Sequence, residues 1–197
     1  QRRISKGLDA RLRWTQFGFR KARSTSQPIH LMRRLIELYE RQDSPMYMVF
    51  LDWKKAFDSV EQDGITESLR RLGAPQHITD VVANLYSNVT FQARDAYGRS
   101  TTKRQERGIR QGCPLSPYLF VTFLSVLMHD VECSFEQQYG YIPNAFASDT
   151  KLWDLEYADD TVILARTADT ASKMIQLVEE EAEKYGLELN KEKCEVF

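Results

Sequence analysis

Two adjacent carboxylates, Asp159 and Asp160, interrupt a stretch that otherwise has the pattern of a β-hairpin. Residues 152–157 alternate between apolar and acidic side chains, and residues 161–165 are apolar and mostly β-branched. This pattern predicts a strand, a turn and a strand over 152–165, with the two acids at the tip. Like charges held so close raise the pKa of one carboxyl group unless a cation neutralises them. The simpler alternative is an ordinary turn, in which Asp is a common residue.

A third acid, Asp52, ends another segment with strand character. The apolar run 46–51 has the length of a buried strand. Sites made only of oxygen ligands suit Mg²⁺, which takes one or two carboxylates and completes its shell with water and substrate phosphate. Two such ions between acids would serve in-line phosphoryl or nucleotidyl displacement. Taken alone, Asp52 could simply cap a turn at the end of the strand.

Four segments of the chain follow one another in the order of the polymerase motifs A to D. They are 50–60 (FLDWKKAFDSV), 108–117 (GIRQGCPLSP), 157–160 (YADD) and 186–193 (GLELNKEK). Together they resemble the reverse transcriptase family. The segment 16–25 (QFGFRKARST) is similar to non-LTR (LINE-type) retrotransposon enzymes and the related group II intron enzymes, more than to the retroviral branch. The resemblance covers nearly the whole chain.

The distribution of charge fits a nucleic-acid partner better than the net charge does. The 197-residue chain has a formal net charge of −1 and 42% hydrophobic residues, enough for one buried core. Residues 1–41, however, carry eleven Lys and Arg side chains against three acids, and a second basic stretch spans 94–110. Phosphate backbones attract such patches. The acids of residues 179–183 are expected to form the solvated face of a helix.

The sequence favours an intracellular protein without a membrane partner. No apolar run approaches the roughly 20 residues that span a bilayer, and the basic start of the chain lacks the features of a secretory signal. The three cysteines have no spacing typical of a disulfide framework or a zinc site. The family resemblance implies a nuclear location if the element is eukaryotic.

The order of predicted elements indicates an α+β fold, with an antiparallel sheet of the split βαβ (ferredoxin-like) kind and helices on one face. The resemblance implies that residues 46–197 form a polymerase palm and that residues 1–45, basic and helical, are part of the fingers. It also brings Asp52 close to Asp159. The expected elements are helices at 28–42, 63–71, 76–86, 119–133 and 169–185, a strand at 46–52, hairpins made by 89–94 with 103–109 and by 152–165, an irregular loop at 134–151, and a short strand after Gly186.

The resemblance implies a metal-dependent active site. Asp52 and Asp159 would hold two Mg²⁺ ions, with Mn²⁺ as an alternative, and Asp160 would support them as a third ligand. The carbonyl group of Trp53 would complete one shell. Lys193 would protonate the departing pyrophosphate. Lys191 competes for that role, and either lysine could be an ordinary surface residue.

The resemblance also implies a nucleotide site. Phe57 would lie against the sugar of the incoming nucleotide and exclude a 2′-hydroxyl group. Gln111 and Gly112 would lie over the nucleotide and the template base, and Ala158 near the sugar or the primer end. The alternatives are that Phe57 is a core aromatic residue and that Gly112 is a loop glycine. Asp58 could act by capping the turn that follows it.

Basic residues near the start of the chain and before motif B are candidates for nucleic-acid binding. Arg20, Lys21 and Arg23 would contact the template backbone, as would Arg110, because phosphate contacts position a strand without reading its sequence. The implied partners are an RNA template, a DNA primer and deoxynucleoside triphosphates. The motifs begin and end as in the central piece of a longer polyprotein, without the thumb.

The function that the resemblance implies is RNA-directed DNA polymerisation for a non-LTR retroelement. The alternatives are a group II intron-type reverse transcriptase and a domesticated, non-catalytic nucleic-acid-binding palm. The presence of Asp52, Asp159 and Asp160 argues against the non-catalytic alternative. Phe57 disfavours an RNA-templated RNA polymerase.

Overall fold

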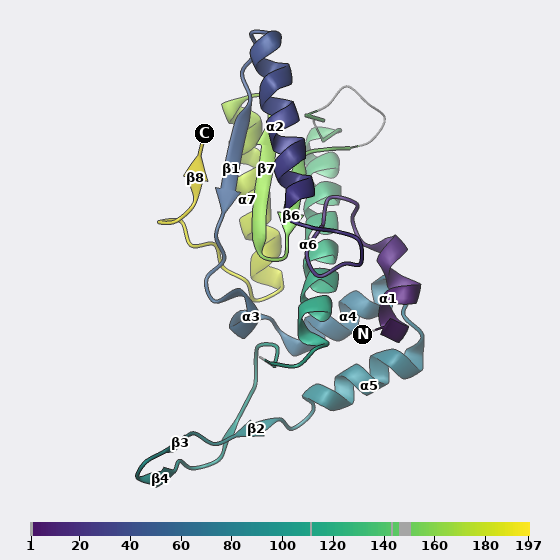
Figure 1. The fold of residues 1–197 in the computed structure, drawn as a ribbon, viewed down its shortest axis with the longest axis vertical. Helices are drawn as coiled ribbons and strands as arrows, with labels where there is room; N and C mark the ends of the chain where they lie inside the picture. Colours follow the sequence, from purple (N-terminus) through teal and green to yellow (C-terminus); the bar gives the residue numbers. More distant parts are fainter. Residues whose placement is uncertain (1, 111, 143, 146–150) are drawn as a thin grey trace.

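A four-stranded antiparallel sheet lies at the centre of the protein, in the strand order β6-β7-β1-β8 (Figure 1). The structure is a computed structural model, and it describes residues 2–110, 112–142, 144–145 and 151–197. The strands of the sheet are β1 (Tyr47–Leu51), β6 (Asp154–Tyr157), β7 (Asp160–Ala165) and β8 (Glu195–Val196).

The register of this sheet brings together the segments that carry the acids. The pairing of β1 with β7 ends with Leu51 opposite Thr161. The hairpin of β6 and β7 closes with Tyr157 opposite Asp160, which confirms the hairpin expected over 152–165. The last residues of β1 and the first residues of β7 therefore lie at the same end of the sheet.

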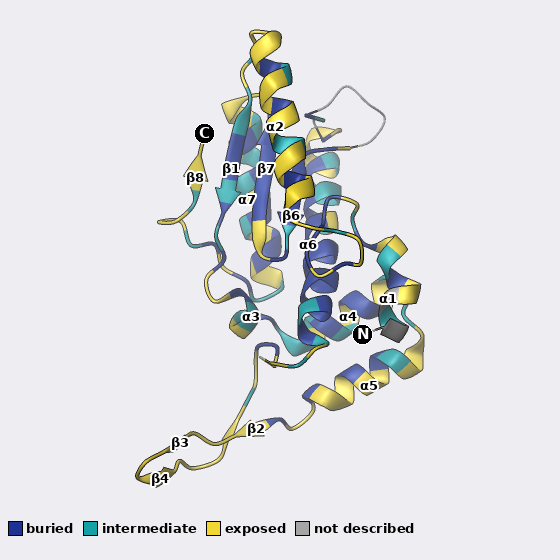
Figure 2. Ribbon diagram, in the orientation of Figure 1, coloured by how far each residue is buried: buried dark blue, intermediate teal, exposed yellow. Residues whose placement is uncertain are grey.

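Helices α6 and α7 cover one face of the sheet, and α4 packs against α6 (Figure 1). Because side chains alternate along a strand, Val49, Leu51 and Ile163 point to this face, where they are buried. Figure 2 shows that burial is concentrated in the sheet and along α6. The helices of this layer are α4 (Gln62–Arg71), α6 (Ser116–Tyr139) and α7 (Ala168–Lys184).

Helix α2 (Ser26–Arg41) covers part of the opposite face. Its Leu35 and Tyr39 are buried against Met48, Val162 and Leu164, the residues of β1 and β7 that alternate with those facing α6. The expected arrangement had helices on one face of the palm. The structure adds this helix, from the segment predicted to belong to the fingers, on the other face.

Helix α6 is longer than the sequence predicted. Expected at 119–133, it runs from Ser116 to Tyr139 and takes in part of the loop expected at 134–151. Phe135 extends the buried side of the helix by another turn, and the helix ends where Gly140 adopts a positive φ of 85°. The sequence did not predict this continuation, because most residues near the C-terminal end of the helix are polar and the apolar periodicity is weak there.

Helix α6 has the length and apolar composition of a membrane-crossing helix, contrary to the expectation that no segment of this chain reaches that length. However, 72% of its most apolar 18-residue window is buried inside the protein. Leu119, Phe123 and Leu127 are fully buried in the core beneath the sheet. The apolar surface of the helix is therefore used in packing the core.

The remaining elements lie outside the two layers. The expected helices at 28–42, 63–71, 76–86 and 169–185 are confirmed, each within two residues at both ends. A thin ribbon of short strands leaves the body between α5 and α6 (Figure 1). These elements are α1 (Arg2–Leu8), the 3-10 helix η1 (Asp9–Arg11), α3 (Ala56–Ser59), α5 (Gln76–Tyr86), β2 (Thr90–Phe91), β3 (Arg94–Asp95), β4 (Gly98–Arg99) and β5 (Lys103–Arg104).

Candidate active site

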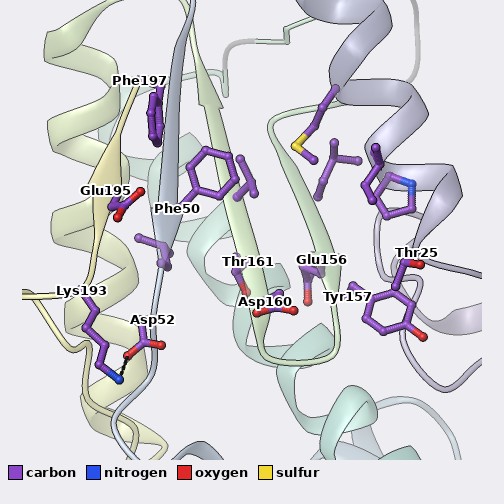
Figure 3. Close-up of a pocket in the computed structure, with 16 residues that line it drawn as sticks. Thr25, Phe50, Asp52, Glu156, Tyr157, Asp160, Thr161, Lys193, Glu195 and Phe197 are labelled. Atoms are coloured by element: carbon purple, nitrogen blue, oxygen red, sulfur yellow. Dashed lines mark ion pairs between the residues drawn. The ribbon is translucent and has the colours of Figure 1, made fainter.

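Asp52 and Asp160 lie opposite each other at the end of the neighbouring strands β1 and β7. They are the next residues after the last β1–β7 pair, Leu51 and Thr161. Both acids line one cavity of about 620 Å³, between α2 and the sheet (Figure 3). Asp159 is exposed in the two-residue turn before β7. Partial burial, and then the charges of Asp159 and Asp52, raise the pKa of Asp160, so the three acids form one electrostatic cluster.

This cluster fits a divalent ion whose shell is completed by substrate and water. Within the described part of the chain, no three His, Cys, Asp or Glu side chains lie at a spacing that would hold a metal ion by themselves. Mg²⁺ does not need such a cage, since it commonly binds one or two carboxylates together with water and phosphate. Partial burial and, after it, the neighbouring charges of Asp159 and Asp52 raise the pKa of Asp160, and a divalent ion would offset the repulsion between these charges. Asp52, Asp159 and Asp160 remain the predicted ligands.

The segment that resembles motif D holds the backbone around Asp52. The amide of Asn190 donates to the carbonyl oxygen of Asp52 at 2.8 Å, and the amide of Lys54 donates to that of Glu188 at 2.8 Å. Trp53 forms a bridge with Leu189 between these two bonds. The polypeptide after β1 is therefore tied to the C-terminal segment on both sides of Trp53.

Lys193 rather than Lys191 lies beside the acids. Its Nζ is 4.0 Å from Oδ2 of Asp52, and its side chain lines the same cavity (Figure 3). The Nζ of Lys191 instead pairs with Glu179 on α7 at 2.9 Å. The position of Lys193 therefore favours it for the role that both lysines were candidates for.

Phe57 packs against the core with one side of its ring and borders a cavity, so its contact with a nucleotide sugar stays a prediction. One side of its ring stacks on Phe120 of α6, with ring centroids 4.4 Å apart. The half-buried ring also lines a second cavity, together with Arg110 and Gly112. Gly112 has a φ of 83°, and a Cβ atom there would meet no atom within 4 Å, so backbone conformation rather than crowding favours glycine. Gln111 lies outside the described residues.

Ala158 is enclosed by protein, which argues against the predicted contact with a nucleotide sugar or primer end. Its side chain is buried with Leu12, Tyr118 and Val121. Its backbone has a φ of 56°, a left-handed conformation that L-residues adopt only at a cost. The residue that precedes Asp159 is therefore a structural part of the turn.

Gln16 holds this turn in place, a role that the sequence analysis missed. Its buried side-chain oxygen accepts hydrogen bonds from the amides of Ala158 at 3.0 Å and Gly18 at 2.7 Å. Its Nε2 donates to Glu156 at 2.8 Å and to the carbonyl oxygen of Ala158 at 3.3 Å. A Cβ atom on Gly18 would lie 2.3 Å from the amide nitrogen of Ala158. The N-terminal segment thus packs directly on the backbone of the acidic turn.

A buried ionic network continues from Gln16 along β6. Arg13 contacts Asp154 at 2.6 Å, Glu132 at 2.7 Å and Glu156 at 3.6 Å. Asp154 and Glu156 are fully buried. Burial and then the charge of Asp154 raise the pKa of Glu156 well above its usual range, because one guanidinium group cannot neutralise every neighbouring carboxylate. The signal in the sequence was the pair of acids at alternate positions of β6. The structure covers both faces of this strand, so these acids need buried partners.

Arg20 is a structural residue, which argues against its predicted contact with template phosphate. Its guanidinium group is buried and donates to the carboxylate of Asp9 and to the carbonyl oxygens of Arg13 and Gln16. Arg23 is half-buried and donates to the carbonyl oxygen of Trp14 at 2.8 Å. The other two predicted phosphate contacts, Lys21 and Arg110, have exposed side chains and stay predictions.

The fold and the site together define a class of protein. An antiparallel sheet backed by two long helices, with acids at the end of one strand and in the neighbouring hairpin, is the palm of a nucleic-acid polymerase. Apo telomerase from Candida tropicalis, truncated from its C-terminal domain, has the same fold, with a TM-score of 0.74 at 17% identity over 100% of this chain and 39% of that one. The expected α+β palm is thus confirmed.

Sequence relatives identify the family. A family profile described as "Reverse transcriptase (RNA-dependent DNA polymerase)" matches residues 1–197. The Pol polyprotein of the type-1 retrotransposable element R2 from Nasonia vitripennis is 30% identical over 95% of this chain and 17% of that protein. The RNA-directed DNA polymerase from mobile element jockey of Drosophila melanogaster is 27% identical over 91% of this chain and 19% of that protein. The chain belongs to the reverse transcriptase family, in its non-LTR retrotransposon branch, and spans less than a fifth of either relative.

Replacing Gln16 with Leu should destabilise the protein, because the amides of Ala158 and Gly18 would lose their acceptor in a buried place. Each unpaired buried group costs about 1–3 kcal/mol. We expect the free energy of unfolding to fall by about 2–4 kcal/mol, seen as a melting temperature lower by roughly 5–15 °C. Gln92→Leu, at an exposed position, is the control. Equal melting temperatures for both variants would show that Gln16 does not hold the turn.

Replacing Glu156 with Gln should change how stability depends on pH. The raised pKa means that the folded protein keeps the Glu156 proton to a higher pH than the unfolded chain, which releases it near about pH 4.3. Above that pH the folded state binds more protons, so the free energy of unfolding falls as pH rises towards the folded pKa. Urea unfolding between about pH 4.5 and 8 should show a smaller decline for Glu156→Gln than for the wild type or for the exposed-site control Glu183→Gln. Parallel pH profiles for all three proteins would contradict this assignment.

Proposed function

We propose that this chain is the central part of an RNA-directed DNA polymerase of a non-LTR retroelement, which extends a DNA primer on an RNA template. The observation that carries the proposal is the cluster of Asp52, Asp159 and Asp160 beside an open cavity of about 620 Å³. A non-catalytic palm would have no need to retain crowded, solvent-accessible acids. Membership of the reverse transcriptase family supports the same conclusion.

The three acids would hold two Mg²⁺ ions, or Mn²⁺ in their place. Bound there, the ions would lower the pKa of the primer 3′-hydroxyl group and neutralise charge on the triphosphate. The chain itself contributes by holding the three acids in fixed positions. Pairing of β1 with β7 fixes Asp52 opposite Asp160, and Gln16 fixes the turn that carries Asp159.

Lys193 would act as the proton donor to the pyrophosphate leaving group. It is the lysine that lies beside Asp52, and its exposed side chain can follow a bound triphosphate. Phe57 and Gly112 border the second cavity, where the sugar and base of the incoming nucleotide would lie. The carbonyl group of Trp53 would complete one metal shell, and Lys21 and Arg110 would contact the strand backbones.

The partners follow from this activity. An RNA template, a DNA primer and deoxynucleoside triphosphates are its substrates. The R2 relative is a polyprotein, and a telomerase of the same fold, also from Candida tropicalis, is described in complex with a fragment of telomeric RNA. Both descriptions support a role for this chain within a longer protein that works on RNA.

Replacing Asp159 and Asp160 with Asn in the intact protein should abolish metal-dependent extension of an oligo(dT) primer on poly(A). We expect the rate to fall by at least about 100-fold, because charge stabilisation by bound ions supplies several kcal/mol of the catalytic effect. Asp63→Asn, at an exposed position of α4, is the control for loss of an acid and should keep full activity. Equal product from the double variant and the wild type would refute polymerisation at this site.

Replacing Phe57 with Val should relax the selection against ribonucleotides, because the smaller side chain leaves room for a 2′-hydroxyl group. We expect the ratio of ribonucleotide to deoxynucleotide incorporation to rise roughly tenfold or more. Phe50→Val is the matched control, since Phe50 lines the cavity of the acids and not the one at Phe57. If sugar discrimination in primer extension is the same for both variants, Phe57 has only its packing role.

A further inference from the structure

The ribbon formed by residues 90–104 is an exposed arm with no role in the core. Every residue in this range is exposed, including Phe91 at 53% and Tyr97 at 98% relative accessibility. Figure 2 shows the arm as an exposed strip that extends from the body beyond the end of the sheet where the β6–β7 turn lies. A two-stranded ribbon without an apolar face is marginally stable in water. The arm therefore has the character of a surface that is completed by a partner.

The charge of the arm indicates the chemistry of that partner. Four cations, Arg94, Arg99, Lys103 and Arg104, accompany a single acid, Asp95. Asp95 is engaged within the turn, where its carboxylate accepts a hydrogen bond from the amide of Tyr97 at 2.8 Å. In the described part of the chain, none of the four cations forms an ion pair. The arm consequently presents uncompensated positive charge.

The pairing of the strands concentrates this charge. Arg94 lies directly opposite Arg99, which places two guanidinium groups on the same face of the ribbon. Like charges directly opposite each other destabilise a strand pair. A row of phosphate groups along that face would remove the repulsion and bind both side chains, as guanidinium groups pair well with phosphate.

Tyr97 at the tip adds a second feature. Its ring is almost fully exposed, and the hydrogen bond from its amide to Asp95 fixes the backbone of the turn that presents it. An exposed aromatic ring beside basic residues is a stacking platform for an unpaired base. A duplex keeps its bases stacked inside, so this feature favours a single strand over a duplex.

We propose that residues 90–104 form an arm that binds single-stranded RNA, with Arg94 and Arg99 on the phosphates and Tyr97 stacked on a base. The proposal rests on the proposed function in taking this strand to be the template before it reaches Asp52 and Asp160. The chain leaves the arm beside the second cavity, since the amide of Ile109 donates to the carbonyl oxygen of Phe57 at 2.7 Å and Phe57 and Arg110 line that cavity. A strand on the arm would thus lead towards the nucleotide site.

Binding of a labelled single-stranded RNA of mixed sequence tests this proposal, measured by fluorescence anisotropy in EDTA so that no reaction occurs. We expect Arg94→Ala with Arg99→Ala to weaken binding and to reduce the slope of log affinity against log salt by about 0.7 for each arginine. Tyr97→Ala should weaken binding roughly tenfold. The matched control is Arg41→Ala with Arg70→Ala, which removes two exposed arginines from the helices α2 and α4, outside the arm.

A blunt RNA–DNA hybrid serves as the second ligand and should bind equally to the wild type and the arm variants. Arm variants that bind the single strand as the control does would overturn the proposal, as would an equal loss on the blunt hybrid. All variants lie outside the core, so matching melting temperatures will show that each is folded. The Asp159→Asn, Asp160→Asn protein should still bind RNA through the arm. If the wild-type protein binds RNA through the arm but does not extend a primer with Mg²⁺ present, the proposed function is refuted and the arm remains an RNA-binding element.

Discussion

The antiparallel pairing of β1 with β7 is the interaction on which the site depends. It places the residue after Leu51 opposite the residue before Thr161, and both of these are Asp. Side chains alternate between the faces of a strand, so a slip of one residue would turn Asp52 towards the α6 face, where Leu51 is buried. The cost of burying a carboxylate in the α6 face protects this register. Apolar packing on both faces of the sheet therefore also specifies the position of the acids.

The acids are supported from behind by a polar layer that is costly to bury. Arg13 and Gln16 connect the N-terminal segment to β6 through contacts across about 140 positions of sequence. Buried charges rarely stabilise a fold as well as apolar packing would, but breaking such a network is strongly destabilising. The network therefore makes the turn at Ala158 rigid, because any movement of that turn leaves buried polar groups without partners. Rigidity of this kind is what a site needs when substrate supplies part of the metal shell.

Local patterns were sufficient to predict most of the helices and the strands β1, β6 and β7, whereas the short strand expected after Gly186 lies later, at Glu195–Val196. The helices α2, α4, α5 and α7 have clear apolar periodicity with Gly or Pro at their ends, and the family motifs gave the order of the fold. The long-range contacts of Arg13, Gln16 and Arg20 were not predictable, because nothing in the local sequence states which partner a polar side chain meets. The end of α6 was predicted too early for a different reason. Burial of Phe135 in the core stabilises the last turns of the helix, although the local apolar pattern there is weak.

The contacts of Arg13 and Arg20 also show that the number of basic residues in a segment does not measure its exposed positive charge. Among the basic residues that make the start of the chain strongly positive, Arg20 is buried, the side chain of Arg13 is only 12% exposed, and both form ion pairs, so they contribute little to the external field. The arginines of the arm carry no such partners in the described residues and face solvent. The count of basic residues therefore overestimates the phosphate-binding surface near the N-terminus, whereas the basic residues of the arm are exposed, as the second basic stretch predicted. Burial decides which charges of this palm are available to a nucleic acid, and it leaves the arginines of the ribbon between α5 and α6 exposed.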